Sequence, residues 1–321
     1  MTVPESPRVD HVARLDLAAF RRAVLDWFDA RGRVFPFRGT TDAYLVLVSE
    51  VLLQQTQISR GGPAWVRFTT EFPTVQALAA ASPADVLRAW QGLGYNRRAI
   101  NLRRAARIVV DELGGAFPRD VAGLERLPGV GPYTARAVAS IAFQVPTGAV
   151  DTNVRRVLGR VLAGGADGLT AHQLQAAADD VVDPGQPDDW THALMDIGST
   201  LCKPVRPLCP ECPVAAFCGY AAGVRPRGLD AARPGVARPR PAGAATRAAA
   251  GEFHETTRWL RGRILDLLRD APGDAWTDFD QPIGGHDRAA IGVSLRAMER
   301  DGLLELEGVE SASPRARLPI A

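Results

Sequence analysis

The chain has 321 residues, more than a single domain usually contains, and 46% of them are hydrophobic, so we expect two domains with a sizeable core. The formal net charge of +2 neither favours nor excludes a nucleic-acid partner. No segment has the run of about 18 apolar residues that a membrane span requires, and the N-terminus lacks the apolar core of a signal peptide. These features predict a cytoplasmic protein without a membrane partner.

Residues 11–222 carry apolar side chains at helical spacing, interrupted by short Gly and Pro breaks. The pattern predicts a first amphipathic helix over about 15–28 and a second over about 44–52. Ser82, followed by a proline and then by Asp85, has the order of a capping box at the start of a further helix. No run alternates strictly enough to predict a strand, so this region is expected to be all-helical.

The second predicted helix contains Glu50, within the string SEVLLQQTQ, among side chains that are apolar nearly all round. The carboxyl group is therefore expected to be partly buried. Burial raises the pKa of a carboxyl group and suits it to donate a proton near neutral pH. The alternative interpretation, from the residues alone, is an ordinary capped or salt-bridged helix glutamate.

Further along, the string WQGLGYNRRAINLRRAA places Tyr95 in a turn after Gly92 and Gly94 and before a run of arginines. Arginines in such a run form a basic face that attracts phosphates. An aromatic side chain in the turn beside them can stack on bases or wedge between them. It can equally cap a hydrophobic core, and the sequence leaves both interpretations open.

The stretch from Leu127 to Asp151 begins with LPGVG, continues with a helical pattern and ends at a lone carboxylate. Gly129 and Gly131 form a short turn that leads into the helix. The first backbone N–H groups of a helix are unpaired and, with the helix dipole, favour an anion. We interpret the turn as a phosphate-binding site, with an ordinary tight turn as the alternative.

All four cysteines lie in one short segment with the spacing Cys-x6-Cys-x2-Cys-x5-Cys. In a reducing compartment such clustering indicates metal or cluster ligation rather than disulfides. Four thiolates can bind a tetrahedral zinc ion or a [4Fe–4S] cluster, and the spacing is unlike that of zinc ribbons. A cluster is therefore preferred to zinc, and zinc to bare thiols. The residues are Cys202, Cys209, Cys212 and Cys218.

Three segments lie outside this helical region. Residues 1–10 are expected to be a flexible N-terminus, and residues 223–252, rich in Pro, Ala, Arg and Gly, a solvated linker whose arginines could alternatively contact DNA phosphates. From 253 to 321, two helical patterns, the turn Asp301-Gly302 and a strand-like end suggest a small winged-helix-like α+β domain. The domain could contact DNA or serve as a packing or partner domain.

Five separated motifs over roughly residues 25–222 resemble those of the helix-hairpin-helix, endonuclease III-like DNA glycosylase superfamily and, within it, of MutY-type adenine-DNA glycosylases. They are FPFR, SEVLLQQTQ, GLGY, LPGVG with VDTN, and the cysteine loop. The resemblance implies an all-α, two-lobed glycosylase over 11–222, with an iron–sulfur loop at 202–218 that carries a [4Fe–4S] cluster. The C-terminal segment does not resemble the nucleotide-hydrolase-like domain by which typical MutY proteins read 8-oxoguanine.

The resemblance also implies a catalytic set. Glu50 would protonate the target purine, Asp151 would be the catalytic carboxylate, and Tyr133 and Asn153 would support Asp151 and the sugar. Bifunctional relatives such as endonuclease III carry a Schiff-base lysine at the position of Tyr133. Because Lys203 is the only lysine of this chain, the resemblance implies a monofunctional, hydrolytic glycosylase.

Contacts with DNA follow from the same resemblance. Gln55 and Tyr95 match residues that wedge into the duplex, Arg38 matches an arginine near the active site, and the hairpin turn matches the phosphate-binding hairpin. Phe37 and Asn96 depart from the family pattern, which has tryptophan and tyrosine there. The implied DNA-binding residues are Arg38, Gln54, Gln55, Tyr95, Leu127, Gly129, Val130 and Gly131.

The sequence therefore predicts a monomeric DNA glycosylase of base excision repair, associated with the nucleoid. It would hydrolyse the N-glycosidic bond of adenine mispaired with guanine or 8-oxoguanine in double-stranded DNA. One alternative is a thymine or uracil glycosylase acting on G/T or G/U mismatches. A second is a non-catalytic DNA-binding iron–sulfur protein, against which the Glu50 and Asp151 pair argues.

Overall fold

The structure, a computed structural model, describes residues 12–223, 253–273, 275–308 and 314–320. The predicted N-terminal segment, 1–10, and all but the first residue of the predicted linker lie outside these ranges. The chain forms two compact units, Met1–Val51 with Phe117–Ala232 and Leu52–Ala116 with Arg233–Ala321. Across the described residues, every helix is too short or too polar to span a bilayer.

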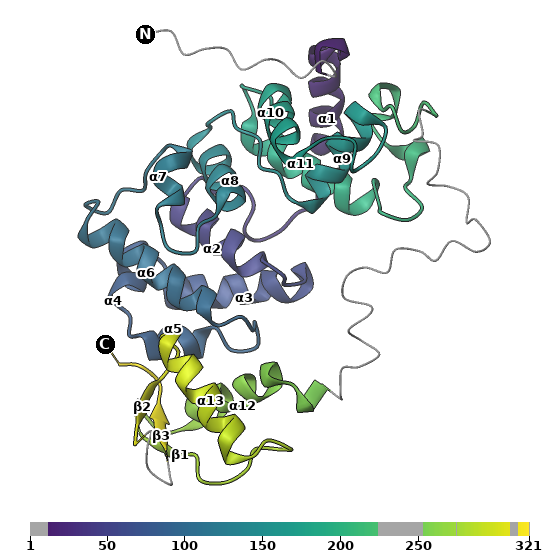
Figure 1. The fold of residues 1–321 in the computed structure, drawn as a ribbon. Helices are drawn as coiled ribbons and strands as arrows, with labels where there is room; N and C mark the ends of the chain where they lie inside the picture. Colours follow the sequence, from purple (N-terminus) through teal and green to yellow (C-terminus); the bar gives the residue numbers. More distant parts are fainter. Residues whose placement is uncertain (1–11, 224–252, 274, 309–313, 321) are drawn as a thin grey trace, which may run out of the picture. The chain divides into compact units, whose positions relative to one another are not determined.

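The first unit is built around α11 (Pro187–Thr200), which packs against α1, α8 and α9 (Figure 1). The buried side chain of Trp190 on α11 meets Phe20 of α1 edge to face, with ring centroids 5.6 Å apart. The other elements are η1 (Val12–Arg14), α1 (Leu17–Arg31), α2 (Ala43–Leu53, through Val51), α7 (Val121–Glu125), α8 (Pro132–Phe143), α9 (Thr152–Ala163), α10 (Ala171–Val181), η2 (Cys209–Glu211) and η3 (Ala215–Phe217). The described part of this unit contains no strand, as predicted.

The helices predicted by apolar spacing are present. The first predicted helix is α1, which begins where the Asp16 side chain accepts a hydrogen bond from the backbone N–H of Ala19. The second is α2, whose apolar run is almost entirely buried. A helix that is apolar nearly all round belongs inside a domain, and α2 therefore brings any polar side chain it carries into the core.

The helical part of the second unit begins after α2. α6 (Arg97–Asp111) packs against α4 (Val75–Ala80) and α5 (Pro83–Ala89), and α3 (Ile58–Glu71) packs against α5. The Ser82 side chain caps α5 by accepting a hydrogen bond from the N–H of Asp85 at 3.0 Å, which confirms the predicted helix start.

The C-terminal segment belongs to this second unit. Its elements are η4 (Phe253–Glu255), α12 (Thr257–Asp270), β1 (Thr277–Asp278), α13 (Arg288–Arg300), β2 (Glu305–Glu307) and β3 (Arg315–Arg317). The strands form an antiparallel sheet in the order β1-β3-β2, with Ala316 of the central strand paired with both Thr277 and Leu306. The two predicted helices and the predicted β-ribbon after Gly302 are confirmed, whereas β1 was not predicted.

The C-terminal segment packs onto the helices of its own unit through backbone and side-chain hydrogen bonds. The N–H of Ala84, in α5, donates to the carbonyl of Pro319 at 2.9 Å. Arg269 of α12, nearly buried, donates to the carbonyl of Leu87 at 3.0 Å and to the Asn96 side chain at 2.8 Å. Because buried groups on both sides share these bonds, α12 is held firmly against α5 and the turn before α6.

Candidate active site

Glu50 lies near the end of α2 and is 9% exposed, in agreement with the burial expected from its apolar neighbours. The pKa of Glu50 is raised to about 7, chiefly because burial disfavours the charged form. The nearby Asp151 carboxylate also raises the pKa, whereas a hydrogen bond with the Tyr133 hydroxyl and the charge of Arg38 lower it. A carboxyl group with this pKa is half protonated near neutral pH and can donate a proton.

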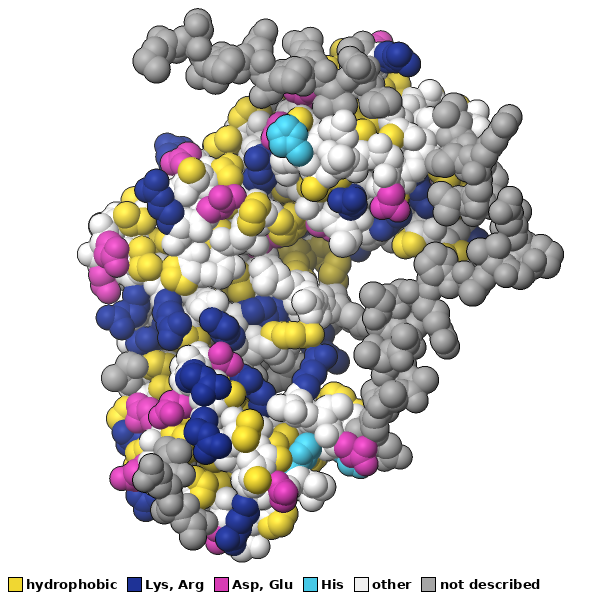
Figure 2. Space-filling model, viewed as in Figure 1, with side chains coloured by type: hydrophobic (Ala, Val, Ile, Leu, Met, Phe, Trp, Pro, Cys, Tyr) yellow, Lys and Arg dark blue, Asp and Glu magenta, His cyan; other side chains and the backbone are white. Residues whose placement is uncertain are grey.

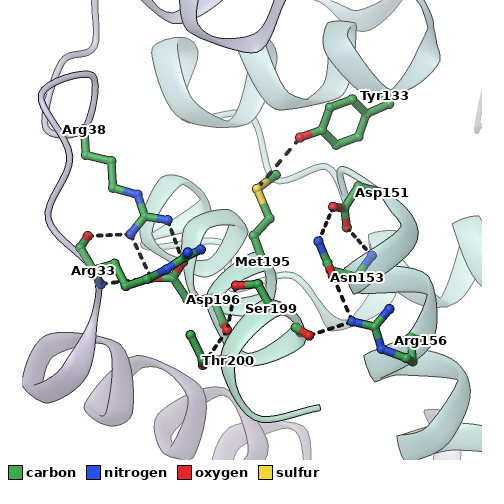
Figure 3. Close-up of polar contacts among 11 residues, drawn as sticks. Arg33, Arg38, Tyr133, Asp151, Asn153, Arg156, Met195, Asp196, Ser199 and Thr200 are labelled. Carbon is green, nitrogen blue, oxygen red and sulfur yellow. Dashed lines mark hydrogen bonds and ion pairs between the residues drawn. The ribbon is translucent and has the colours of Figure 1, made fainter. Parts of the chain in front are cut away.

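Tyr133 is the second residue of α8, and its side chain lies near Glu50. Its hydroxyl contacts the Met195 sulfur of α11 at 3.8 Å (Figure 3) and also hydrogen-bonds with Glu50. Burial raises the pKa of Tyr133 well above its usual value, and the two carboxylates raise it further. The side chain therefore contributes a neutral hydroxyl to the site.

Asp151 is the N-cap residue of α9, and its carboxylate is held by three N–H groups, two of which belong to Asn153 (Figure 3). Oδ1 accepts from the backbone N–H groups of Asn153 and Val154 at 2.8 and 2.7 Å, and Oδ2 accepts from Asn153 Nδ2 at 2.9 Å. The start of a helix favours a negative charge, and these bonds fix its orientation. The position is one that can stabilise a developing cation.

Asn153 is in turn held by Arg156, one helical turn later on α9. The Asn153 Oδ1 atom accepts from Arg156 at 2.8 Å, and Arg156 also donates to the carbonyls of Gly198 and Cys202 at 2.6 and 2.5 Å. Neither Arg156 nor Gly198 was predicted. The three-residue spacing of Asn153 and Arg156, which places them on one helix face, is the signal in the sequence that could have pointed to Arg156.

Gly198 is required by the close approach of two helices. A Cβ atom at this position would lie 2.5 Å from the Asn153 Cβ and 3.1 Å from Asn153 backbone atoms. α11 therefore approaches the first turn of α9 more closely than any other residue would permit. Nothing in the local sequence distinguishes Gly198 from an ordinary helix glycine.

The loop that leads from α8 to Asp151 is held by Asp179 of α10. One carboxylate oxygen, Oδ1, accepts from Arg136 at 2.7 Å, from the Gly148 N–H at 2.8 Å and from the Thr147 hydroxyl at 3.1 Å. These bonds join α8, α10 and the loop in front of Asp151, so the carboxylate of Asp151 is positioned from both sides along the chain.

Arg38, predicted to contact DNA, is bound to a second buried carboxylate. Its guanidinium donates to both oxygens of Asp196, each at 2.8 Å, and to the carbonyl of Arg33 at 2.6 Å (Figure 3). Arg33 also donates to Asp196 through its backbone N–H at 2.9 Å and its Nε at 2.8 Å. Arg38 thus anchors the segment before α2, and a DNA contact by Arg38 stays a prediction.

The residues predicted to bind DNA in the hairpin between α7 and α8 are of two kinds, buried side chains and glycines. Leu127 and Val130 are buried at 3% and 7% exposure, and their backbone N–H groups donate to the carbonyls of Leu124 and Leu127, so these two residues fix the shape of the turn. Gly129 has φ +80°, a left-handed conformation that favours glycine, whereas Gly131 has no atom within 4 Å of the position of a Cβ. The turn therefore offers backbone N–H groups with open space at the start of α8.

The predicted wedge residues lie in the second unit. Gln55 follows the end of α2, next to Gln54, which was predicted only to bind DNA, and Tyr95 lies in the turn before α6. Four described non-glycine residues have positive φ, and Gln55 (φ +54°) and Tyr95 (φ +47°) are two of them. Such strained backbone is uncommon and is often retained where a side chain must be presented in one direction. Tyr95 is 46% exposed, so its ring does not cap the core.

The four cysteines are brought together in the first unit. Their thiols line one small cavity together with apolar side chains such as Val157 and Ile197. Arg160 of α9 donates to the Cys202 sulfur at 3.3 Å and to the carbonyl of Lys203 at 2.8 Å. In the described residues no group of three or more His, Cys, Asp or Glu side chains is arranged to hold a single metal ion.

Known proteins resemble this chain in sequence. Residues 48–184 match the family model of the HhH-GPD superfamily base excision DNA repair proteins. The adenine DNA glycosylase of Mycolicibacterium smegmatis (strain ATCC 700084 / mc(2)155) is 39% identical over 284 residues, which cover 88% of this chain and 91% of that protein. The adenine DNA glycosylase of Rattus norvegicus is 47% identical over 215 residues, or 63% of this chain, and this chain covers 42% of that protein.

Two solved structures are similar in fold. A thermostable thymine-DNA glycosylase, 29% identical, superposes with a TM-score of 0.60 over 64% of this chain and 97% of its own. Endonuclease III in a non-covalent DNA complex, 24% identical, superposes with a TM-score of 0.54 over 65% of this chain and 98% of its own. The predicted endonuclease III-like fold is therefore confirmed as mostly helical, with one small sheet in the C-terminal segment. The chain belongs to the adenine DNA glycosylase family within the HhH-GPD superfamily of base excision DNA repair proteins.

Proposed function

We propose that the protein is a monofunctional DNA glycosylase that removes adenine mispaired with guanine or 8-oxoguanine from double-stranded DNA. The observation that carries the proposal is the juxtaposition of Glu50, whose pKa is raised to about 7, with the anchored carboxylate of Asp151. A protonated carboxyl group and a carboxylate are the pair that most enzymes use to cleave a glycosidic bond. Membership of the adenine DNA glycosylase family supports adenine as the base.

The mechanism follows from the surroundings of the two groups. An adenine within a duplex is out of reach, so it must be swung into the site. The protonated Glu50 carboxyl then donates its proton to the purine ring, and the C1′–N9 bond breaks with its electrons moving to the base. The Asp151 carboxylate, held by three N–H groups, stabilises the oxocarbenium-like sugar. Water adds to C1′ and its proton returns to Glu50.

Hydrolysis without strand cleavage is part of the proposal. Strand cleavage by a glycosylase requires an amine that forms a Schiff base with the sugar. Tyr133 contributes a hydroxyl at the site, and Lys203, the only lysine of the chain, lies in the cysteine loop. A hydroxyl group has no nitrogen and therefore cannot form a Schiff base.

A [4Fe–4S] cluster bound by the four cysteines is a further part of the proposal. Four cysteine thiols that line one apolar cavity are the donor set that such clusters use, so these four residues would hold the cluster. When bound, the cluster would supply a rigid cross-link within the loop. The exposed Lys203 and Arg206 of that loop would then be available to contact DNA phosphates.

The C-terminal segment has the order of helices and strands that a winged helix would have, and we propose that it is a winged-helix-like domain. The protein is proposed to act as a monomer. We also keep one rival substrate in view, thymine or uracil opposite guanine, because a thymine-DNA glycosylase is similar in structure. Protonation of a purine by Glu50 and the names of the relatives favour adenine.

Single-turnover excision tests the proposal. Duplexes with A, T or U opposite guanine or 8-oxoguanine are incubated with excess protein and assayed for abasic sites. We expect adenine to be released from its duplexes, leaving abasic sites, and Glu50→Gln and Asp151→Asn each to slow base release by at least about 10²-fold, because each removes a group used in the transition state. Binding of the same duplexes should be retained in both variants.

The controls separate the possible results. Asp111→Asn, at an exposed pair on α6, should leave excision unchanged. Preferential release of thymine or uracil would replace adenine by the rival substrate. Full adenine release by Glu50→Gln or Asp151→Asn would refute the assigned roles, and no release from any duplex by the parent protein would leave only a DNA-binding protein.

A further inference from the structure

A basic groove runs across the second unit between the turn before α6 and the first turns of α12. Its volume is about 790 Å³. Six arginines line it, from α3, from the turn and start of α6, and from α12: Arg60, Arg97, Arg98, Arg258, Arg261 and Arg263. Figure 2 shows Lys and Arg side chains gathered over α6 and over the helices of the C-terminal segment. The groove thus combines side chains from the family fold and from the C-terminal segment.

The charges in the groove are only partly neutralised. Arg97 and Arg261 share the Asp301 carboxylate, and Arg98 donates to backbone carbonyls. The remaining three, Arg60, Arg258 and Arg263, are exposed and have no carboxylate partner among the residues that the structure describes. The one acidic side chain that lines the groove, Asp266, is paired with Arg269 at 3.2 Å. An anion is therefore strongly favoured here.

Tyr95 connects this groove to the predicted wedge. The Arg258 guanidinium lies over the Tyr95 ring, 4.7 Å from its centroid, and Arg98 lies 5.6 Å from it. An arginine stacked on an exposed aromatic ring is held close to whatever the ring contacts. Because the backbone of Tyr95 is left-handed and the ring is 46% exposed, Arg258 is presented beside the edge of the groove rather than packed into the core.

We propose that α12 is part of the DNA-binding surface, and that Arg258 and Arg263 bind phosphates of the same duplex that Tyr95 contacts. The proposal rests on the proposed function, since it concerns the DNA on which the glycosylase acts. It assigns a role to the C-terminal segment, which the sequence left open between DNA contact and packing. The occupant is a nucleic-acid backbone because several unpaired guanidinium groups spread along an open groove match a row of phosphates.

The experiment measures duplex binding by the full chain over a range of salt concentrations. Each phosphate contact contributes about 0.9 to the slope of log K against log salt, so Arg258→Ala combined with Arg263→Ala should lower the slope by roughly two and weaken binding roughly tenfold or more. The matched control is Arg300→Ala, which removes the same charge from an exposed position on α13 outside the groove. The control should leave the slope unchanged.

A second pair of variants tests the groove without removing a contact. Gly262 lines the groove on α12 and has no atom within 4 Å of the position of a Cβ, so a longer side chain fits. Gly262→Glu places a negative charge among the arginines, while Gly262→Gln adds the same bulk without the charge. Both should raise helix stability slightly, since glycine is a poor helix former. We expect Gly262→Glu to weaken duplex binding at least fivefold more than Gly262→Gln.

Two results would overturn the proposal. One is an unchanged salt slope in the Arg258 and Arg263 double variant, or an equal loss with Arg300→Ala. The other is equal binding by the two Gly262 variants. The proposed function fails separately, if the parent protein releases no base while the groove variants still lower the salt slope. Conversely, base release with an unaffected slope would refute the groove alone.

Discussion

Two buried carboxyl groups of the first unit, Glu50 on α2 and Asp196 on α11, have opposite surroundings. Asp196 is fully buried, but hydrogen bonds from Arg38 and Arg33 outweigh its burial and hold its pKa below the usual value. Glu50 is almost as buried and has no arginine hydrogen-bonded to it among the described residues, so burial prevails and its pKa rises to about 7. The comparison shows that hydrogen bonds from arginine, rather than the degree of burial, decide whether a buried carboxyl group stays charged or can donate a proton.

The largest effect on stability is expected when the charge of Asp196 is removed. Asp196→Asn leaves the guanidinium groups of Arg33 and Arg38 without their carboxylate, and removing one partner from a buried ion pair typically costs about 3–5 kcal/mol. We expect the free energy of unfolding in urea to fall by that amount. The same substitution at the exposed pair of Asp111 with Arg107 should change it by less than about 1 kcal/mol. Equal effects at both positions would contradict the structural role of Asp196.

The pH dependence of stability sharpens the comparison, since the two groups act with opposite sign. Glu50 has a raised pKa, so its contribution is fully present below pH 4.5 and is lost as the pH rises through about 7, a loss on the order of 3 kcal/mol. Asp196 has a lowered pKa, so its contribution is present above pH 3.8 and is lost as the pH falls through its folded-state pKa.

Urea unfolding between pH 5 and pH 8 measures the first of these effects. We expect the stability of the parent protein to fall relative to that of Glu50→Gln over this range, because the variant has no proton to lose at that position. Single-turnover excision by the parent should fall with pH over the same window. Parallel stability curves for the two proteins would show that Glu50 has an ordinary pKa.

The smallest effect is expected from a change that displaces the Asp151 carboxylate without changing a charge. Gly198→Ala, two residues from Asp196, would place a Cβ 2.5 Å from that of Asn153 and shift the turn of α9 that holds Asp151. We expect excision to slow about tenfold, because small displacements of catalytic groups are costly, with a stability loss of about 1–3 kcal/mol. Gly292→Ala, which meets only the flexible end of Arg296, is the control and should leave excision unchanged. Normal excision by Gly198→Ala would show that the contact of α11 with Asn153 does not position Asp151.

The sequence permitted much of the fold to be predicted, because helix formation is largely local. Apolar spacing predicted α1, α2, α12 and α13, and the run around Glu50 predicted the burial of that side chain. The long-range contacts around the two carboxyl groups could not be predicted from the sequence. Asp196 and Arg38 are separated by 158 residues, and the steric demand at Gly198 comes from a different helix, so neither appears in any local pattern. Motif resemblance supplied Tyr133 and Asp151, but not the role of Arg156 behind Asn153.

α9 connects the Asp151 carboxylate with the cysteine loop of the first unit. Its N-terminal end carries the hydrogen-bonded Asp151 and Asn153, and its second and third turns carry Arg156 and Arg160, which donate to the carbonyls of Cys202 and Lys203. Because a helix of this length is rigid, a displacement of the cysteine loop would be passed along α9 to Asp151. Loss of order in the cysteine loop would therefore displace the Asp151 carboxylate as well, and the consequence for the proposed glycosylase is a loss of activity rather than a loss of selectivity.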